Sequence, residues 1–176
     1  MRNSLHHQSG AVLVISLIML LLLTLIGTAG VQTTTLEEKM AGNQKDRNLA
    51  LQAAESALLL AEASLDVSVA ALPSFSNAGT GGFYSQASTI PTRAALLTDA
   101  FWTGNPVATS TVAGLGNDIA QPRYIIQQLP ATCFSASDCA ASPPVNRTPY
   151  RITVRATGGG AGSSAVVILQ SIYTPP

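Results

Sequence analysis

Two cysteines and two histidines are the residues of this sequence with the most distinctive chemistry. Cys133 and Cys139 enclose the polar segment CFSASDC, and His6 and His7 are adjacent near the N-terminus. The C-x5-C spacing is neither a redox C-x-x-C nor a common zinc spacing. It predicts a disulfide if the segment lies in an oxidising compartment, with two unpaired thiols as the alternative. Adjacent histidines offer at most two ligands, so we expect no metal site.

Catalytic groups are scarce in the remainder of the chain. No histidine follows His7, which excludes Ser-His-Asp and Cys-His arrangements. The carboxylates beyond residue 66 are the isolated Asp99, Asp118 and Asp138. The glycine-rich segment 158–164 precedes an apolar stretch typical of a strand, whereas a phosphate-binding loop needs a helix after its glycines. We therefore predict that the protein is not an enzyme and uses no cofactor.

The charge balance limits the classes of partner. Nine Lys and Arg residues and nine Asp and Glu residues among 176 give a net charge of zero. The charged fraction of 10% lies well below the ~25% of an average soluble protein. The basic residues are scattered along the chain, whereas contacts to phosphates need them clustered. We therefore expect no nucleic-acid partner.

Residues 11–31 form an apolar segment without a charge, and the nearest charged residues are Arg2 and Glu37. As a helix this segment is about 31 Å long at ~1.5 Å per residue, which is enough to cross a bilayer. A cleaved secretory signal is the alternative, but its apolar part would cover only ~7–15 residues and end at a small-residue cleavage site. One arginine before the span and two glutamates after it favour a cytoplasmic N-terminus, with the rest of the chain outside.

An amphipathic helix is predicted to continue the apolar segment over residues 32–72. Leucines and alanines recur at spacings of three, four and seven residues and form one apolar stripe: Leu51, Ala54, Leu58, Ala61, Leu65 and Leu72. Such a stripe must pack on a sheet of the same chain or on neighbouring copies.

The remaining residues are predicted to form a loop-rich connection followed by a sheet. Residues 73–123 are rich in Ser, Thr, Gly, Ala and Pro, with one short helix near 92–101. The region 124–176 carries the cysteine loop and three predicted strands: 124–129, 150–157 and 165–173. In the second strand the residues expected to face the core alternate with polar ones: Tyr150, Ile152, Val154 and Ala156. The predicted fold class is α+β, a long N-terminal helix packed on a small antiparallel sheet of three to four strands.

Two segments of the chain resemble the PilX family of type IV minor pilins. The first is QSGAVLVISLIMLLLLTLIGTAGVQTTTLEEKMAGNQKDRNLALQAAESALLLAE, with TTTLEEKMAGN and ALQAAESAL as its most specific parts; the second is the C-terminal YRITVRATGGG…VVILQSIY. In residues 67–149 we recognise no pattern of the family. The resemblance implies a pilin-like fold. It also implies that residues 1–10 are a leader, which prepilin peptidase cuts between Gly10 and Ala11 before the new N-terminus is methylated.

The resemblance also gives Ile15 a meaning. Major pilins usually have a glutamate as the fifth residue after cleavage, which is thought to pair with the terminal amine of a neighbouring subunit, and here that residue is Ile15. The absence of this glutamate fits a subunit at the fibre tip, because no other subunit lies ahead of it there. The resemblance thus implies a minor pilin that promotes the initiation of type IV pilus assembly. It would span the inner membrane once with its body in the periplasm, and then sit at the pilus tip on the cell surface.

The implied partners are other minor pilins and the major pilin, through the N-terminal helix, together with a tip adhesin and the prepilin peptidase. Two other interpretations stay open at this point. One is a K-type pseudopilin-like tip subunit of a type II secretion system, a class of protein that also lacks this acid. The other is a membrane-anchored periplasmic binding module with an uncleaved leader.

Overall fold

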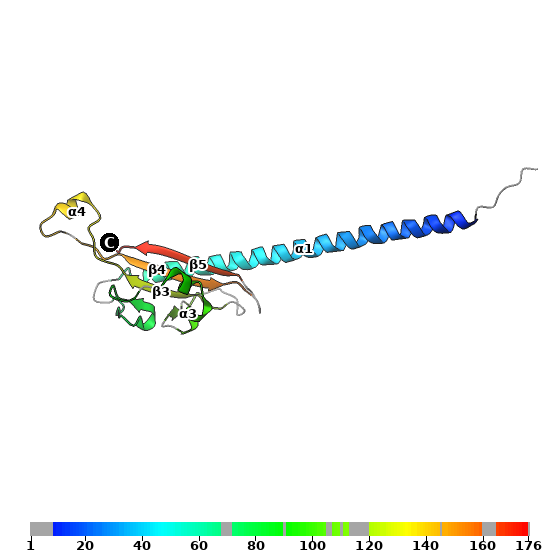
Figure 1. The fold of residues 1–176 in the computed structure, drawn as a ribbon. Coiled ribbons are helices and arrows are strands. Elements are labelled where there is room, and N and C mark those ends of the chain that lie inside the picture. The colour runs from blue at the N-terminus through cyan, green and yellow to red at the C-terminus, as the bar shows by residue number, and fades with distance from the viewer. Residues whose placement is uncertain are drawn as a thin grey trace, which may run out of the picture. The chain divides into compact units, whose positions relative to one another are not determined.

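The computed structural model describes residues 9–67, 72–89, 91–104, 107–109, 111–112, 120–144, 146–159 and 165–175 (Figure 1). Most of the expected leader, residues 1–8, and most of the glycine-rich segment 158–164 lie outside the described residues. The chain divides into two compact units, Met1–Gln44 and Lys45–Pro176. The second unit is called the body below.

One helix, α1 (Ser9–Ala63), confirms the long N-terminal helix. It ends at Ala63 and not at residue 72 as predicted. The N–H of Leu65 donates to the carbonyl of Glu62 at 2.9 Å, a tighter pairing than the regular helical bond, and Leu65 is fully buried. Asp66 and Val67 follow, and both residue types are poor helix formers. Leu72 keeps the apolar period but packs on the core from outside the helix.

In the described part of the chain the sheet contains three long strands and two short ones. The long strands are β3 (Arg123–Gln128), β4 (Tyr150–Thr157) and β5 (Val166–Tyr173), and each agrees with its predicted bounds to within one residue at either end. They lie side by side in Figure 1, with β4 antiparallel to both of its neighbours.

Two strands of two residues each were not predicted. Strand β1 (Phe83–Tyr84) pairs with β3 in parallel, and β2 (Ala108–Thr109) pairs with β3 in the antiparallel sense. The sheet order is β1-β3-β4-β5, with β2 also on β3. The sheet is therefore mixed and five-stranded, which corrects the predicted antiparallel sheet of three to four strands. A strand of two residues is too short to show the alternation on which the prediction rested.

The part of α1 in the body packs on one face of the sheet through small side chains. The core there joins Ala53, Ala54, Ala57, Ala61 and Leu65 to Ile126, Tyr150, Ile152, Val154 and Ala156. All four residues predicted to face the core from β4 are buried. The predicted helix stripe was only partly right, because Leu51 is 38% exposed while Ala50, Ala53 and Ala57 are buried in its place. We call this alanine-lined face of α1 the alanine face.

The opposite face of the sheet carries a second, smaller core. The single helix predicted near 92–101 is split into α2 (Arg93–Leu96) and α3 (Asp99–Gly104). Trp102 on α3 is fully buried with Tyr84 and Ile125, and its indole N–H donates to the carbonyl of Leu96 at 2.8 Å. This bond ties the two short helices together, so they cover part of the sheet as one unit.

Two further short helices lie in loops of the body. The 3-10 helix η2 (Thr80–Gly82) leads into β1, and α4 (Ala136–Ala140) lies between β3 and β4. Gly82 has φ of +89°, and a Cβ added there would lie 2.5 Å from the backbone nitrogen of Ala108. Glycine is therefore required where β1 and β2 meet along β3.

Candidate functional site

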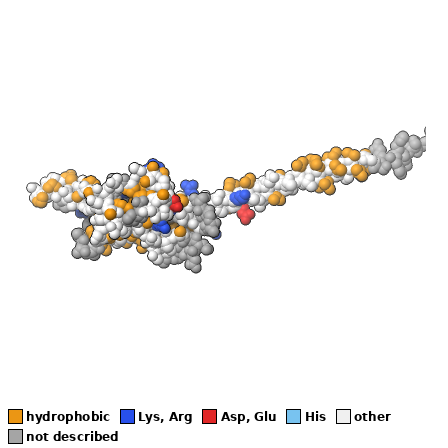
Figure 2. All heavy atoms as spheres, turned by 60° about the horizontal axis from the view of Figure 1, so that its bottom comes forward, with side chains coloured by type: hydrophobic (Ala, Val, Ile, Leu, Met, Phe, Trp, Pro, Cys, Tyr) orange, Lys and Arg blue, Asp and Glu red, His pale blue; other side chains and the backbone are white. Residues whose placement is uncertain are grey.

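The N-terminal unit presents an apolar helical surface. Over residues 10–44 every side chain of α1 is exposed, and an 18-residue window reaches a mean hydropathy of 2.8. Figure 2 shows hydrophobic side chains along this helix. By length and composition the helix could cross a membrane, which fits a membrane anchor.

The hydroxyl groups within the apolar segment are satisfied inside the helix. Ser16 Oγ donates to the carbonyl of Leu13 at 2.8 Å, and Thr24 Oγ1 donates to that of Leu21 at 2.8 Å. A hydroxyl that bonds to its own helix needs no water or partner group in a bilayer, where unsatisfied polar groups are costly. These residues are therefore compatible with an apolar surrounding on all sides.

The residues of the expected cleavage site lie at the start of α1. Gly10 and Ala11 are helical and exposed, and a Cβ added to Gly10 would meet no heavy atom within 4 Å. Nothing in the described fold therefore requires a glycine at position 10. Ile15 is 57% exposed on the same stretch of helix. The fold thus leaves Gly10 and Ile15 free to serve interactions outside the chain.

The cysteine loop is a closed excursion between β3 and β4. Cys133 and Cys139 form a disulfide with their Cα atoms 5.3 Å apart, as expected from the sequence. At the base of the loop the backbone groups of Thr132 and Arg147 exchange two hydrogen bonds of 2.9 and 3.0 Å. Phe134 inside the loop is 55% exposed. The loop therefore holds an aromatic side chain out in solvent on a covalently closed support.

Short-range bonds fix the helix inside this loop. Helix α4 begins after Ser135, whose hydroxyl accepts from the N–H of Asp138 at 3.0 Å. Such an N-cap satisfies a backbone donor that the first helical turn leaves unpaired. The sequence CFSASDC contains a capping pattern for this helix, a serine followed three residues later by an acid. We did not use this pattern in the sequence analysis.

The face of the sheet opposite α1 is rich in arginine. Arg155 on β4 forms an ion pair with Asp99 of α3 at 2.7 Å, and Arg123 on β3 donates to the backbone carbonyl of Trp102. The Asp99 side chain is 73% exposed, so solvent screens this pair and its contribution to stability is small. Both arginines hold the α2–α3 unit against the strands.

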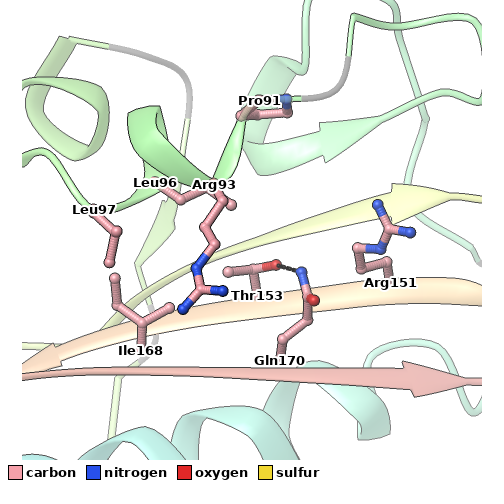
Figure 3. Close-up of a pocket in the computed structure, with 8 residues that line it drawn as sticks. All are labelled: Pro91, Arg93, Leu96, Leu97, Arg151, Thr153, Ile168 and Gln170. Carbon is pink, nitrogen blue, oxygen red and sulfur yellow. Dashed lines mark hydrogen bonds between the residues drawn. The ribbon is translucent and has the colours of Figure 1, made fainter.

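Beside this unit lies a cleft of about 540 Å³, which sequence analysis did not find (Figure 3). We call it the arginine cleft, and its lining comes from α2, β4, β5 and the residues next to α2: Pro91, Arg93, Leu96, Leu97, Arg151, Thr153, Ile168 and Gln170. Arg93 and Arg151 are far apart in sequence, and only the folding of α2 onto the sheet brings them together. No spacing in the sequence could have indicated this.

Three tyrosines are the described titratable groups whose pKa clearly departs from its ordinary value. Burial raises the pKa of the phenols of Tyr84, Tyr124 and Tyr150 above 10, so they stay neutral at physiological pH. Among the residues that the structure describes, no three His, Cys, Asp or Glu side chains gather in a way that could hold a metal ion.

A membrane-length apolar helix that continues into a body, where it packs on a small sheet, defines the pilin-like class of α+β proteins. Two family models match this chain: PilX N-terminal over residues 9–59, and type IV pilus assembly protein PilX C-term over residues 40–175. No significant match was found among curated proteins or among solved structures. Because the second match covers more than half of the sequence, the chain belongs to the PilX family of type IV pilus assembly proteins.

Membership of this family makes the chain a minor pilin of type IV pilus assembly, which is a structural component of the pilus. The family also implies interaction with other pilus components. The N-terminal match includes Gly10, Ala11 and Ile15, and the C-terminal match includes the disulfide and the arginine cleft. All the candidate functional surfaces therefore lie in regions of the chain that the two family models match.

Proposed function

We propose that this minor pilin promotes the initiation of pilus assembly and occupies the complex at the fibre tip. The observation that carries this proposal is Ile15, an exposed apolar residue on an uncharged stretch of α1. Within a fibre shaft the terminal amine of the next subunit would lie in an apolar surrounding and would need an acid as its partner. Leaving such a charge unpaired costs several kcal/mol at every repeat, by the order of magnitude known for buried ion pairs. One copy at the tip avoids that cost because no subunit lies ahead of it.

The proposed route to the tip begins with cleavage between Gly10 and Ala11 by the prepilin peptidase. The open surroundings of Gly10 are compatible with this step, because the helix makes no contact there that would hinder access to the bond after it. The disulfide supports a periplasmic position of the body, since disulfides persist in oxidising compartments. After cleavage, α1 would pack against the helices of the major pilin and other minor pilins, and the body would face a tip adhesin.

The cleavage step is tested with two matched glycine substitutions in full-length protein. Gly10→Leu should leave residues 1–10 attached, whereas Gly27→Leu should be processed normally, because an added Cβ meets no heavy atom within 4 Å at either position. Intact mass of the detergent-extracted protein distinguishes the two products. Normal processing of Gly10→Leu, or a wild-type protein that retains its leader, would contradict the proposal and favour an uncleaved membrane anchor.

The tip position is tested by composition and by deletion. Sheared fibres analysed by quantitative mass spectrometry should contain far less of this chain than of the major pilin. Deletion should reduce the number of surface pili while the major pilin remains in the membrane. A chain carrying Ile15→Glu should still restore pili, since a tip subunit has no amine ahead to pair. Equal abundance of this chain and the major pilin would exclude the tip position.

A further inference from the structure

Four arginines and one acid account for the charged groups described around the α2–α3 unit and the strand face beneath it. Asp99 is already paired with Arg155, and Arg123 already donates to the carbonyl of Trp102. Arg93 on α2 and Arg151 on β4 both line the arginine cleft, and among the described residues neither has an ion pair. The cleft therefore holds two guanidinium groups whose charge the described part of the chain leaves unbalanced.

The floor of the cleft is polar and uncharged. Thr153 is 2% exposed, and the side-chain amide of Gln170 donates to its hydroxyl oxygen at 3.1 Å. Figure 3 shows Arg93 reaching down from α2 on one side of this pair, and Arg151 rising from β4 on the other. Thr153 and Gln170 carry no charge, so they do not neutralise the arginines. Both guanidinium groups can therefore donate to a group that enters between them.

An apolar wall lies directly beside the charged groups. Leu97 is 65% exposed, and it lines the cleft together with Ile168 of β5; Figure 3 shows both on the side of Arg93 away from Arg151. A free inorganic anion would leave this wall in contact with water and would fill only a small part of about 540 Å³. A chain that carries an acid and an adjacent apolar side chain covers both features. Guanidinium forks match carboxylates in two-bond geometry, which favours an acid as the charged partner.

We infer that the arginine cleft binds an acidic peptide segment of a partner protein. Its carboxylates accept hydrogen bonds from Arg93 and Arg151, and an apolar side chain next to them packs on Leu97 and Ile168. The two positive charges also attract an acidic segment at a distance, which increases the association rate at low salt. This binding does not depend on the position of the chain in the fibre, so it can fail while the tip assignment holds, and the reverse.

The inference is tested on the full chain in detergent by fluorescence anisotropy. The probe is a fluorescein-labelled peptide of three Leu-Glu repeats, and the matched peptide of three Leu-Gln repeats measures partition into the detergent. Arg93→Gln and Arg151→Gln should each weaken binding of the acidic peptide by about fivefold or more, as expected for charge-assisted hydrogen bonds in a partly exposed site. Arg147→Gln removes an exposed arginine outside the cleft and should change binding less than twofold.

Three results would overturn the inference. They are equal binding of the Leu-Gln peptide, equal loss of affinity with Arg147→Gln, and displacement of the acidic peptide by an equal concentration of inorganic phosphate, which would indicate a site for free anions. Fluorescence of Trp102, the only tryptophan of the chain, reports whether each variant keeps its fold. A variant whose Trp102 melting temperature is lowered is replaced by the lysine substitution at the same position. Lysine keeps the charge and should retain part of the affinity.

Discussion

The alanine face of α1 makes the attachment of helix to sheet sensitive to a single added side chain. Ala57 is fully buried in the core that joins α1 to β4. Ala57→Leu adds three carbon atoms where the packed helix and sheet leave no space for them. Extra carbons in a well-packed core typically cost about 1–3 kcal/mol, because neighbouring side chains and backbone must shift. We therefore expect a destabilised body with an otherwise intact fold.

The matched control is Ala63→Leu, at an exposed position on the last turn of the same helix. Surface substitutions of this kind usually change stability by less than about 0.5 kcal/mol. For a body of this size, ~1 kcal/mol corresponds to about 3–4 °C in Tm, so Ala57→Leu should lower Tm by about 3–12 °C and Ala63→Leu by less than about 2 °C.

The assay is thermal denaturation followed by the fluorescence of Trp102. Trp102 lies in the core on the other face of the sheet. Its fluorescence therefore reports the unfolding of the body and not that of the N-terminal unit. A shift at Trp102 caused by a change at Ala57 shows that both cores unfold together. Equal Tm values for Ala57→Leu and Ala63→Leu would refute the close approach of α1 to the sheet.

Three further outcomes follow from particular contacts. Gly82→Ala should destabilise the body by about 2 kcal/mol or more, because the positive φ and the 2.5 Å approach to Ala108 N leave no room for a Cβ, and an unchanged urea midpoint would count against that geometry. Burial raises the pKa of Tyr150 above 10, so its share of stability is complete below pH 10 and declines as pH rises further. The urea midpoint of the wild type should therefore fall more steeply above pH 10 than that of Tyr150→Phe, and parallel curves would be inconsistent with this. Replacing both Cys133 and Cys139 with serine should cost at most about 2 kcal/mol and should speed proteolysis of the loop, whereas unchanged cleavage kinetics would show that the disulfide does not restrain it.

The sequence predicted those parts of the fold in which a residue pattern repeats over several positions. The alternation of Tyr150, Ile152, Val154 and Ala156 gave the correct buried face of β4 because each strand residue points to the side opposite its neighbour. The apolar content of residues 11–31 likewise gave the long helix.

The predicted helix face failed where size mattered more than hydrophobicity. Leu51 is more hydrophobic than Ala53 or Ala57, but the alanines are the residues that α1 buries against the sheet, and Leu58 is only partly buried beside them. Leucines such as Leu59, which is 67% exposed, therefore point away from the sheet. Periodicity alone cannot choose between an alanine face and a leucine face on one helix.

The candidate sites divide in the same way. The disulfide was predictable because the two cysteines are close in sequence. The role of Ile15 rests on the family resemblance and stays a prediction. The arginine cleft was not predictable, since Arg93 and Arg151 meet only through the packing of α2 on the sheet. Cleavage between Gly10 and Ala11 stays a prediction.

The closed base of the cysteine loop makes the loop a suitable site for inserting a peptide tag. The chain enters the loop at Thr132 and leaves it at Arg147, and two backbone hydrogen bonds between these residues hold the base of the loop beyond the paired strands β3 and β4. A peptide tag or fluorophore attachment site inserted after Phe134 would remain tethered at a fixed point on the sheet. Light or electron microscopy could then locate the labelled subunit while the sequence of α1 stays unchanged.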